Sequence, residues 1–537
     1  MNKKLILALA ASTGLYGLSA NSAHAVDKSW NVGTGNWGSS GNWSPAGVPT
    51  ASDIVWLNHL VSGVRGVVHV NSTGFPSPIS VNIRQSNELD IDNFSALSVG
   101  GDVFVGYDSS VGFLNVNSPQ PGVVFYNGNL TVGNTLRLGY GSSFGAMAQN
   151  DGTVTVNQLV RVGDRQATSP IFPGTGRYNL SGVGVLNAAR LEVGYGGDSS
   201  QFACEGEVNL SGNAVMNVSL GAQIPDPKIG GNGGIGTFNQ TGGTFNCPSR
   251  IPSLGGATGS GIYNFSGGTY AAPGLSIGTT GTLNYNGGAN LSVGQLSTTN
   301  GHVNLSSGGG KVLRASLLFT SAGNWAIDLN DNAMVVSSTL GETVASAVAR
   351  GRAGGAWTGN GITSTAARNE PHHATTLGYM TGAEYRSVYG SSATFGGVAV
   401  TDAQTIIKYT WYGDTDFNGR VNFDDYVRTD NGFNNHRTGW LNGDFNGNGQ
   451  VNFDDYVLID LAFNNQSGTL GRALSFLNGD RGQTDMTDPA LRQVQQHLAE
   501  FGADYANHFR AAVPEPASLG LIAAVVPLAA RRRRRRV

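Results

Sequence analysis

Apolar and polar residues alternate in short segments through most of the first 300 residues of the chain. Segments such as LEV at 191–193 and VNL at 208–210 place every second side chain on the same face, which is the periodicity of a β-strand. Glycine and asparagine separate the segments, as expected for turns that need a positive φ. Long runs with the helical period are absent from this part of the sequence. The pattern predicts a mostly β protein.

The alternating segments belong to an imperfect repeat with two halves, Gly-x-x-Asn-x-Ser-Gly and Leu-x-Val-Gly. A unit of 20 to 30 residues with short strands and regular turns predicts a right-handed parallel β-helix over residues 26–300. A β-sandwich or a series of antiparallel meanders is the alternative. The asparagines that mark the first half are Asn179, Asn209, Asn239, Asn264 and Asn284.

The pattern changes after residue 300. Residues 324–336 alternate like a strand, a Gly-rich loop follows, and 394–413 returns to strands, so we predict a small β-rich module over 301–410. Near the other end, Asp488 precedes Pro489 and a run of apolar residues at helical spacing. An N-cap aspartate followed by proline is typical of a helix start, which predicts a helical segment within 467–510.

Composition and charge narrow the possible partners. Glycine accounts for 80 of 537 residues and charged residues for only 12%. The formal net charge is −3, but it includes Lys3, Lys4 and six terminal arginines; without them 24 basic residues face 35 acidic ones, a charge of −11. An acidic chain argues against nucleic acid and favours cations. The two cysteines, Cys204 and Cys247, either form one bridge or stay as free thiols.

Two near copies 30 residues apart carry the most specific chemistry: GDTDFNGRVNFDDYVRTDNGFNN from Gly413 and GDFNGNGQVNFDDYVLIDLAFNN from Gly443. Each contains a 12-residue loop of the EF-hand type, with oxygen ligands at positions 1, 3, 5, 7, 9 and 12 and a glycine at position 6. The first set is Asp414, Asp416, Asn418, the carbonyl of Arg420, Asn422 and Asp425. The second set is Asp444, Asn446, Asn448, the carbonyl of Gln450, Asn452 and Asp455.

These loops predict two Ca²⁺ sites, with turns of Asn, Asp and Gly that hold no metal as the alternative. Three carboxylates in the first loop against two in the second predict weaker binding in the second. Val421 and Val451 occupy position 8, where two such loops can pair through a short strand.

Residues 411–466 resemble a pair of dockerin type I repeats. The resemblance implies an α-helical module that folds around its Ca²⁺ and binds a cohesin-like module through helix faces that begin near loop positions 10 and 11. Here those positions are Phe423-Asp424 and Phe453-Asp454, which differ from the small hydroxyl pairs of cellulosomal dockerins, so an internal Ca²⁺-stabilised spacer is the alternative. The expected core residues are Phe423, Tyr426, Val427, Phe433, Phe453, Tyr456, Val457 and Phe463.

Both ends of the chain look like targeting segments. Residues 1–25 combine two lysines, an apolar stretch and small residues, which is typical of a secretory signal peptide; a buried N-terminal helix is the alternative. At 513–537, Pro514, Glu515 and Pro516 precede a 14-residue apolar run and six arginines. About 21 Å of helix is too short for a ~30 Å bilayer core, which favours transient membrane insertion over a permanent anchor.

The order of these parts resembles a PEP-CTERM sorting signal, with a short C-terminal transmembrane sorting helix. The resemblance implies an exosortase-like membrane protease that recognises the Pro-Glu-Pro motif. The whole pattern predicts an exported protein of the cell surface or extracellular matrix with a structural or adhesive role. The alternatives are a dockerin-bearing enzyme that acts on polysaccharides and a cohesin-docking component of a carbohydrate-binding complex. For the enzyme, the candidate acids Asp90 and Asp92 fit a solvated strand face, and His372-His373 fits an exposed loop.

Overall fold

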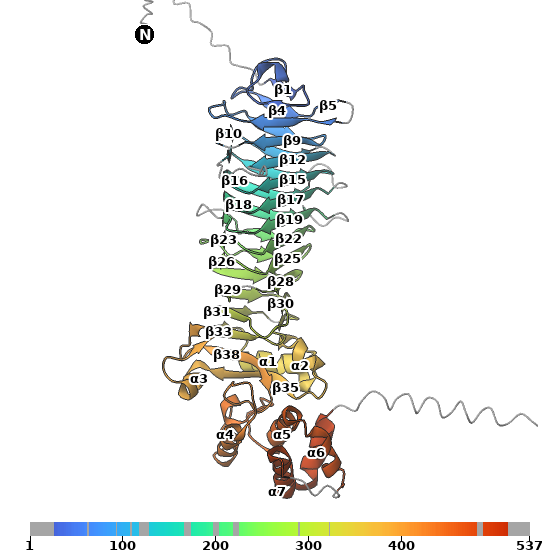
Figure 1. The fold of residues 1–537 in the computed structure, drawn as a ribbon, viewed down its shortest axis with the longest axis vertical. Coiled ribbons are helices and arrows are strands. Elements are labelled where there is room, and N and C mark those ends of the chain that lie inside the picture. Colours follow the sequence, from blue (N-terminus) through green and yellow to red (C-terminus); the bar gives the residue numbers. More distant parts are fainter. Residues whose placement is uncertain are drawn as a thin grey trace, which may run out of the picture.

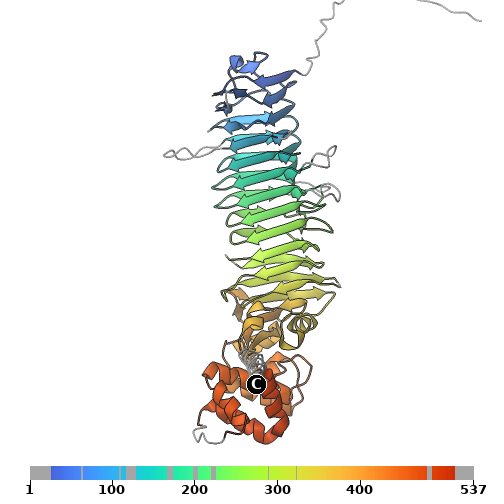
Figure 2. The same ribbon diagram turned by 90° about the vertical axis from the view of Figure 1, so that its right-hand side faces the viewer.

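The computed structural model describes residues 26–513, except for 62–63, 93, 108–109, 117–127, 166–172, 197–202, 219–224, 288–289, 322 and 481–486. The predicted signal peptide and the predicted sorting signal, with Pro514, Glu515 and Pro516, lie outside the described residues. The described chain is elongated, with a long stack of strands that leads to a helical end (Figures 1 and 2). It is mostly β, as the alternation predicts.

Two large sheets form the stack, and most of their strands pair in parallel. The larger sheet contains β1 (Asp27–Trp30), β3 (Trp43–Ser44), β4 (Ile54–Leu57), β8 (Ser80–Ile83), β10 (Ala96–Val99), β11 (Val103–Tyr107), β13 (Asn129–Val132), β14 (Thr135–Tyr140), β16 (Thr153–Asp164), β18 (Val185–Tyr195), β20 (Val215–Val218), β21 (Lys228–Ile229), β23 (Thr244–Asn246), β24 (Ser253–Leu254), β26 (Thr269–Ala271), β27 (Gly274–Ile277), β29 (Leu291–Thr298), β31 (Val312–Thr320), β33 (Ala333–Leu340), β35 (Thr375–Thr381) and β38 (Thr405–Trp411).

The smaller sheet contains β2 (Thr34–Asn36), β7 (Val67–Val70), β9 (Asn87–Ile91), β12 (Val111–Val116), β15 (Phe144–Gln149), β17 (Thr175–Leu180), β19 (Glu205–Leu210), β22 (Ile235–Gln240), β25 (Ser260–Phe265), β28 (Gly281–Tyr285), β30 (His302–Leu305), β32 (Ala326–Asp328) and β34 (Gly361–Thr363). Two short antiparallel pairs, β5 (Leu60–Val61) with β6 (Val64–Arg65) and β36 (Thr394–Phe395) with β37 (Val398–Ala399), complete the strands.

In each repeat the chain contributes strands to the larger sheet and then to the smaller one. Each strand therefore pairs with its counterpart one repeat later. The asparagines of the repeat show this register, because Asn179 on β17 lies beside Asn209 on β19, which lies beside Asn239 on β22. Each side-chain amide donates a hydrogen bond to the carbonyl of the preceding asparagine, at 2.8 Å in both pairs. The ladder continues through Asn264 and Asn284 to Asn304. Loops of different length between the strands account for the unequal spacing of the repeat.

Two glycine positions of the repeat meet at a corner of each coil. Gly163, from the Leu-x-Val-Gly half, has φ +72°, and a Cβ there would lie 2.1 Å from the carbonyl oxygen of Glu205. Gly176, from the Asn half, would place a Cβ 2.2 Å from the backbone nitrogen of Gly163. No side chain fits at such separations, so the repeat needs glycine for close approach between coils as well as for a left-handed turn.

The inward side chains form one continuous apolar core along the stack. At its first end Trp30, Trp37 and Trp43 are buried, and their rings meet edge to face at 4.9 and 5.0 Å. Rings of this size cover the open end of the core. Cys204 and Cys247 are both buried and are not joined by a disulfide bridge.

Parallel pairing continues beyond residue 300, where the sequence pattern changes. β30 pairs with β32, and β32 with β34, because the inward positions Val303 and Ile327 remain apolar and buried. The stack ends where β38 pairs antiparallel with both β33 and β35. Around this end lie α1 (Val344–Arg352), α2 (Thr365–Asn369) and α3 (Gly382–Tyr389).

Four further helices follow: α4 (Phe423–Asn434), α5 (Phe453–Ser467), α6 (Leu470–Leu477) and α7 (Pro489–Ala512). Asp488 caps α7 by accepting a hydrogen bond from the backbone nitrogen of Ala490, which confirms the predicted helix start. The apolar side of α7 packs with α4, α5 and α6 in a second core. Among the described residues, no helix combines the length and apolar character that a membrane crossing requires.

Candidate metal centres

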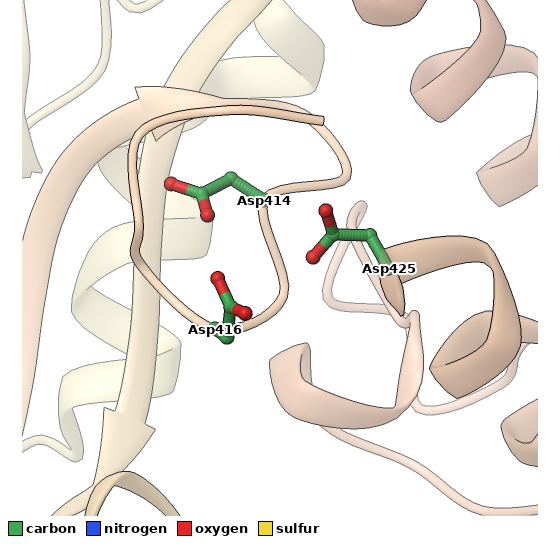
Figure 3. Close-up of side chains that lie close together, drawn as sticks. All are labelled: Asp414, Asp416 and Asp425. Carbon is green, nitrogen blue, oxygen red and sulfur yellow. The ribbon is translucent and has the colours of Figure 1, made fainter. Parts of the chain in front are cut away.

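The first predicted calcium loop connects strand β38 to helix α4. Asp414, Asp416 and Asp425 come together there, with one carboxylate oxygen of each within 4.8 Å of the others (Figure 3). All three side chains are buried. Carboxylates gathered this closely away from water repel one another unless a cation lies among them. This is the arrangement of hard oxygen ligands that Ca²⁺ prefers.

Hydrogen bonds within the loop hold these carboxylates in place. Asp414 accepts from the backbone nitrogen of Gly419 at 3.0 Å, and Asp416 accepts from that of Asn418 at 3.0 Å. Asp425, in the first turn of α4, accepts from the backbone of Thr415 at 2.9 Å and forms a capping box with Asn422. Gly419 has φ +88°, which explains the glycine at position 6.

The second loop repeats this hydrogen-bond pattern between the 3-10 turn η3 (Trp440–Asn442) and α5. Asp444 accepts from the backbone nitrogen of Gly449 at 3.0 Å, and Asp455 forms a capping box with Asn452. Two carboxylates take part here, because position 3 is Asn446 instead of aspartate. The remaining predicted ligand positions in the two loops, Asn418, Arg420, Asn448 and Gln450, are exposed loop residues.

Burial perturbs the protonation of the loop carboxyl groups. It raises the pKa of Asp414 to about 7 and that of Asp425 to about 6. In the second loop, burial raises the pKa of Asp455 to about 7. In addition, Oδ1 of Asp414 is buried and has no hydrogen-bond partner in the described structure. An unpaired buried carboxylate oxygen fits a metal ligand, so the donor set of the first loop suits Ca²⁺.

One charged residue near the first loop lies outside the ligand pattern. Arg428, one turn into α4, places Nη1 3.2 Å from Asp416 and 3.7 Å from Asp425. The equivalent residue in the second repeat is Leu458. A sequence signal could have revealed these ion pairs of Arg428. It consists of an arginine one helical turn beyond position 12, together with aspartates at positions 3 and 12.

Position 8 of the loops shows a different contact from the predicted strand pairing. The backbone nitrogen of Val421 donates to the side-chain amide of Gln466 at 3.0 Å, and that amide donates back to the carbonyl of Val421 at 3.1 Å. The amide therefore takes the place of a neighbouring strand. Neither Val421 nor Val451 lies in a described strand.

The predicted core of the module is partly wrong. Tyr426, Tyr456 and Val457 are buried, but Phe423 is 75% exposed and Val427 is 46% exposed. Their counterparts in the second repeat contact α7, whose Phe501 packs against Phe453. Among the described residues, no helix covers the equivalent side of α4.

The other candidate acids lie far from the loops, in the stack. Asp90 lies on β9 and Asp92 lies just after it, so they do not share a strand as predicted, but both lie near His69, whose Nδ1 is 3.7 and 3.3 Å from them. Asp90 also accepts a hydrogen bond from Asn115 on the next strand, which makes it a participant in a polar ladder. His372 and His373 are half-buried near Glu370.

Comparisons with protein families, with curated proteins and with solved structures find no match to this chain.

Proposed function

We propose that the chain is an exported, calcium-binding surface or extracellular-matrix protein with a structural or adhesive role. In this proposal the stack is a right-handed parallel β-helix that acts as a rigid spacer. The parallel register supports the architecture, and the nearly universal right-handedness of parallel crossover connections supports the hand. The helical end is a dockerin-like module stabilised by two Ca²⁺ ions.

The cluster of Asp414, Asp416 and Asp425 carries the proposal. A bound Ca²⁺ would balance the charge of these three buried carboxylates, of which Arg428 offsets only one unit. Asp414 and Asp425 would act as ligands that the backbone of the loop already orients, while Asn422 and Asp425 keep α4 in register with the loop. Because folding brings the carboxylates together, we expect metal binding to stabilise the module.

Calorimetry and thermal melts of the whole chain, with Ca²⁺ or with a chelator, test this proposal. We expect two bound ions and, after chelation, a lower melting temperature for the helical end while the β signal of the stack persists. Asp414→Asn should abolish one site. Asp402→Asn, at an exposed ion pair with Arg386, is the matched control and should leave both sites intact. A melting curve unchanged by chelation would contradict the proposal.

The exposed face of α4 favours a second candidate function, the docking of a cohesin-like module. Phe423 and Val427 lie one turn apart on α4, and large exposed apolar residues of this kind are typical of interaction surfaces. Binding of a purified cohesin to the calcium-loaded chain, compared with Phe423→Ser, tests this candidate. Equal binding by wild type and variant would exclude this face.

We further propose processing at both ends, by a signal peptidase after Ala25 and by an exosortase-like membrane protease at Pro514, Glu515 and Pro516. The supporting pattern at the N-terminal end is two lysines, an apolar stretch and small residues. At the C-terminal end it is the Pro-Glu-Pro motif, an apolar run and six arginines. Mass spectrometry of the protein from its native cells tests the proposal. A full-length chain that begins at Met1 and ends at Val537 would contradict it.

A further inference from the structure

Aromatic and arginine side chains gather along one side of the stack, on the outer face of the larger sheet. We call this group the outer row. It also includes the two carboxylates that pair with the arginines, so its members are Trp56, Arg84, Phe104, Tyr107, Arg137, Tyr140, Arg161, Asp164, Arg190 and Glu192.

The strand register places these residues in columns. Phe104 on β11 lies beside Arg137 on β14, which lies beside Arg161 on β16. In the second column Tyr107 lies beside Tyr140. Phe104 points outward because its neighbours Val103 and Val105 belong to the buried core, and successive side chains of a strand alternate between faces.

The rings and guanidinium groups of the outer row contact one another. The rings of Tyr107 and Tyr140 are nearly parallel, at 6°, with centroids 5.7 Å apart, and Trp56 lies 6.1 Å from Tyr107. Arg84 lies over the ring of Trp56 at 4.6 Å, and Arg137 lies 5.4 Å from the ring centre of Tyr140. These contacts fix the orientation of long side chains that would otherwise move freely in solvent.

Positive charge exceeds negative charge in the outer row. Asp164 and Glu192 are buried, and they form ion pairs with three of the arginines, Arg137, Arg161 and Arg190. Within this set, three guanidinium groups face two carboxylates. The excess is local, because the chain as a whole has a formal net charge of −3. A positive patch on an acidic protein points to an anionic ligand.

The fold itself does not need these side chains. Farther along the stack, the first column continues through Lys228 to Ser253, Ser276 and Ser297, and the parallel pairing is maintained there. Serine therefore suffices at this outer position. Large apolar side chains return to this column at Phe319 and Leu340. The rings and arginines that contact one another lie in the first half of the stack, where they cost conformational entropy and expose apolar surface.

We propose that the outer row binds an acidic polysaccharide that lies along the stack. The proposal rests on the surface or matrix function above and names its partner. Guanidinium groups donate paired hydrogen bonds to carboxylate or sulfate groups, and the tyrosine and tryptophan rings offer apolar surface to sugar rings. Strands about 4.7–4.9 Å apart repeat these groups along one direction, which suits a linear polymer.

Binding of the whole calcium-loaded chain to four probes tests the proposal: polygalacturonate, dextran sulfate, neutral dextran and oligothymidylate. We expect binding to at least one acidic glycan that weakens as salt rises. The variant Arg84→Ser/Phe104→Ser/Tyr140→Ser should weaken it by about tenfold or more, as expected for the loss of several ring and cation contacts. The matched control is Arg177→Ser, an exposed arginine paired with Glu207 on the smaller sheet, which should bind normally.

The outcomes distinguish a carboxylated from a sulfated polysaccharide, and both of these from the competing ligands. Tighter binding of polygalacturonate indicates a carboxylated glycan, and tighter binding of dextran sulfate indicates a sulfated one; both support the proposal. Equal binding of neutral dextran, tighter binding of oligothymidylate, or no binding would overturn it. Circular dichroism checks the folding of the triple variant, and the single variant Arg84→Gln, with a smaller expected loss, serves if that variant misfolds. Calcium calorimetry on the same sample shows whether the proposed calcium function stands independently.

Discussion

The two calcium loops are near copies in sequence, yet they lie in different surroundings. Both use the same capping box and the same backbone hydrogen bonds to their first aspartate. The first loop carries Arg428 beside its carboxylates, and its helix leaves Phe423 exposed. The second loop has neither feature, because Leu458 replaces the arginine and α7 covers Phe453. Local sequence therefore determines the loop conformation, whereas distant segments determine charge and burial around it.

This difference bears on the expected order of affinities. Three carboxylates against two favour the first loop, but Arg428 adds one positive charge next to Asp416 and Asp425. Arg428 therefore offsets one of the three ligand carboxylates of the first loop. We still predict weaker binding in the second loop, by a smaller margin than the count of carboxylates alone suggests.

The largest predicted difference concerns the two phenylalanines that start the helices. Phe453→Ala should lower the free energy of unfolding of the helical end by about 2 kcal/mol, since its ring packs against Phe501 and His508. Phe423→Ala, at a 75% exposed position, should cost less than about 0.5 kcal/mol. Urea unfolding of the whole chain in saturating Ca²⁺ measures both. Equal losses would show that the two helices are covered alike.

The next prediction concerns the charge beside the first loop. Arg428→Leu, which copies Leu458, should tighten Ca²⁺ binding in the first loop about tenfold, or about 1.4 kcal/mol. One unit charge about 4 Å away is worth about 1 kcal/mol in water and about 4 kcal/mol near a protein surface. Calorimetry resolves the change, and Arg437→Leu, an exposed arginine after α4, is the control. An unchanged affinity would mean that the Arg428 side chain moves away from the carboxylates at no cost in free energy when the ion binds.

The sequence predicted those features that local patterns determine. Alternation predicted the strands, and the oxygen pattern predicted the loop in which Asp414, Asp416 and Asp425 meet. The spaced asparagines revealed the repeat, although their ladder of hydrogen bonds was not predicted. Features that depend on long-range register were not predicted from the sequence. The outer row forms only because loops of unequal length still return Phe104 and Arg137 to one column. The exposure of Phe423 depends on which helix α7 covers.

A smaller effect is expected from pH, through the contact between α7 and α5. His497 on α7 places Nδ1 2.6 Å from Asp460 on α5. Burial lowers the pKa of His497, but the charge of Asp460 and its hydrogen bond outweigh burial and raise the pKa overall. A pKa that is higher in the folded than in the unfolded protein stabilises the fold at low pH. The stabilisation is complete below the unfolded value of about 6.5 and disappears as pH rises through the folded value.

Melting temperatures of wild type and His497→Gln in saturating Ca²⁺ test this sign. The difference between them should be largest near pH 5.5 and should shrink toward pH 8.5. Comparison with the variant cancels the titration of the loop carboxyl groups, which both proteins share. A difference that grows with pH would mean that neutral histidine is the stabilising form.

The smallest predicted effect concerns Gln466, whose side-chain amide makes two hydrogen bonds to the backbone of the first loop. Gln466→Ala removes both hydrogen bonds to the backbone of Val421 and should cost about 1 kcal/mol, since each bond contributes modestly at an exposed side chain. His436, at the equivalent position of the first repeat, is exposed. These two hydrogen bonds therefore stabilise the first loop only. Amide hydrogen exchange should speed up at Val421 and stay unchanged at Val451; equal acceleration at both would show that the loops are coupled, as in the strand pairing that the sequence suggested.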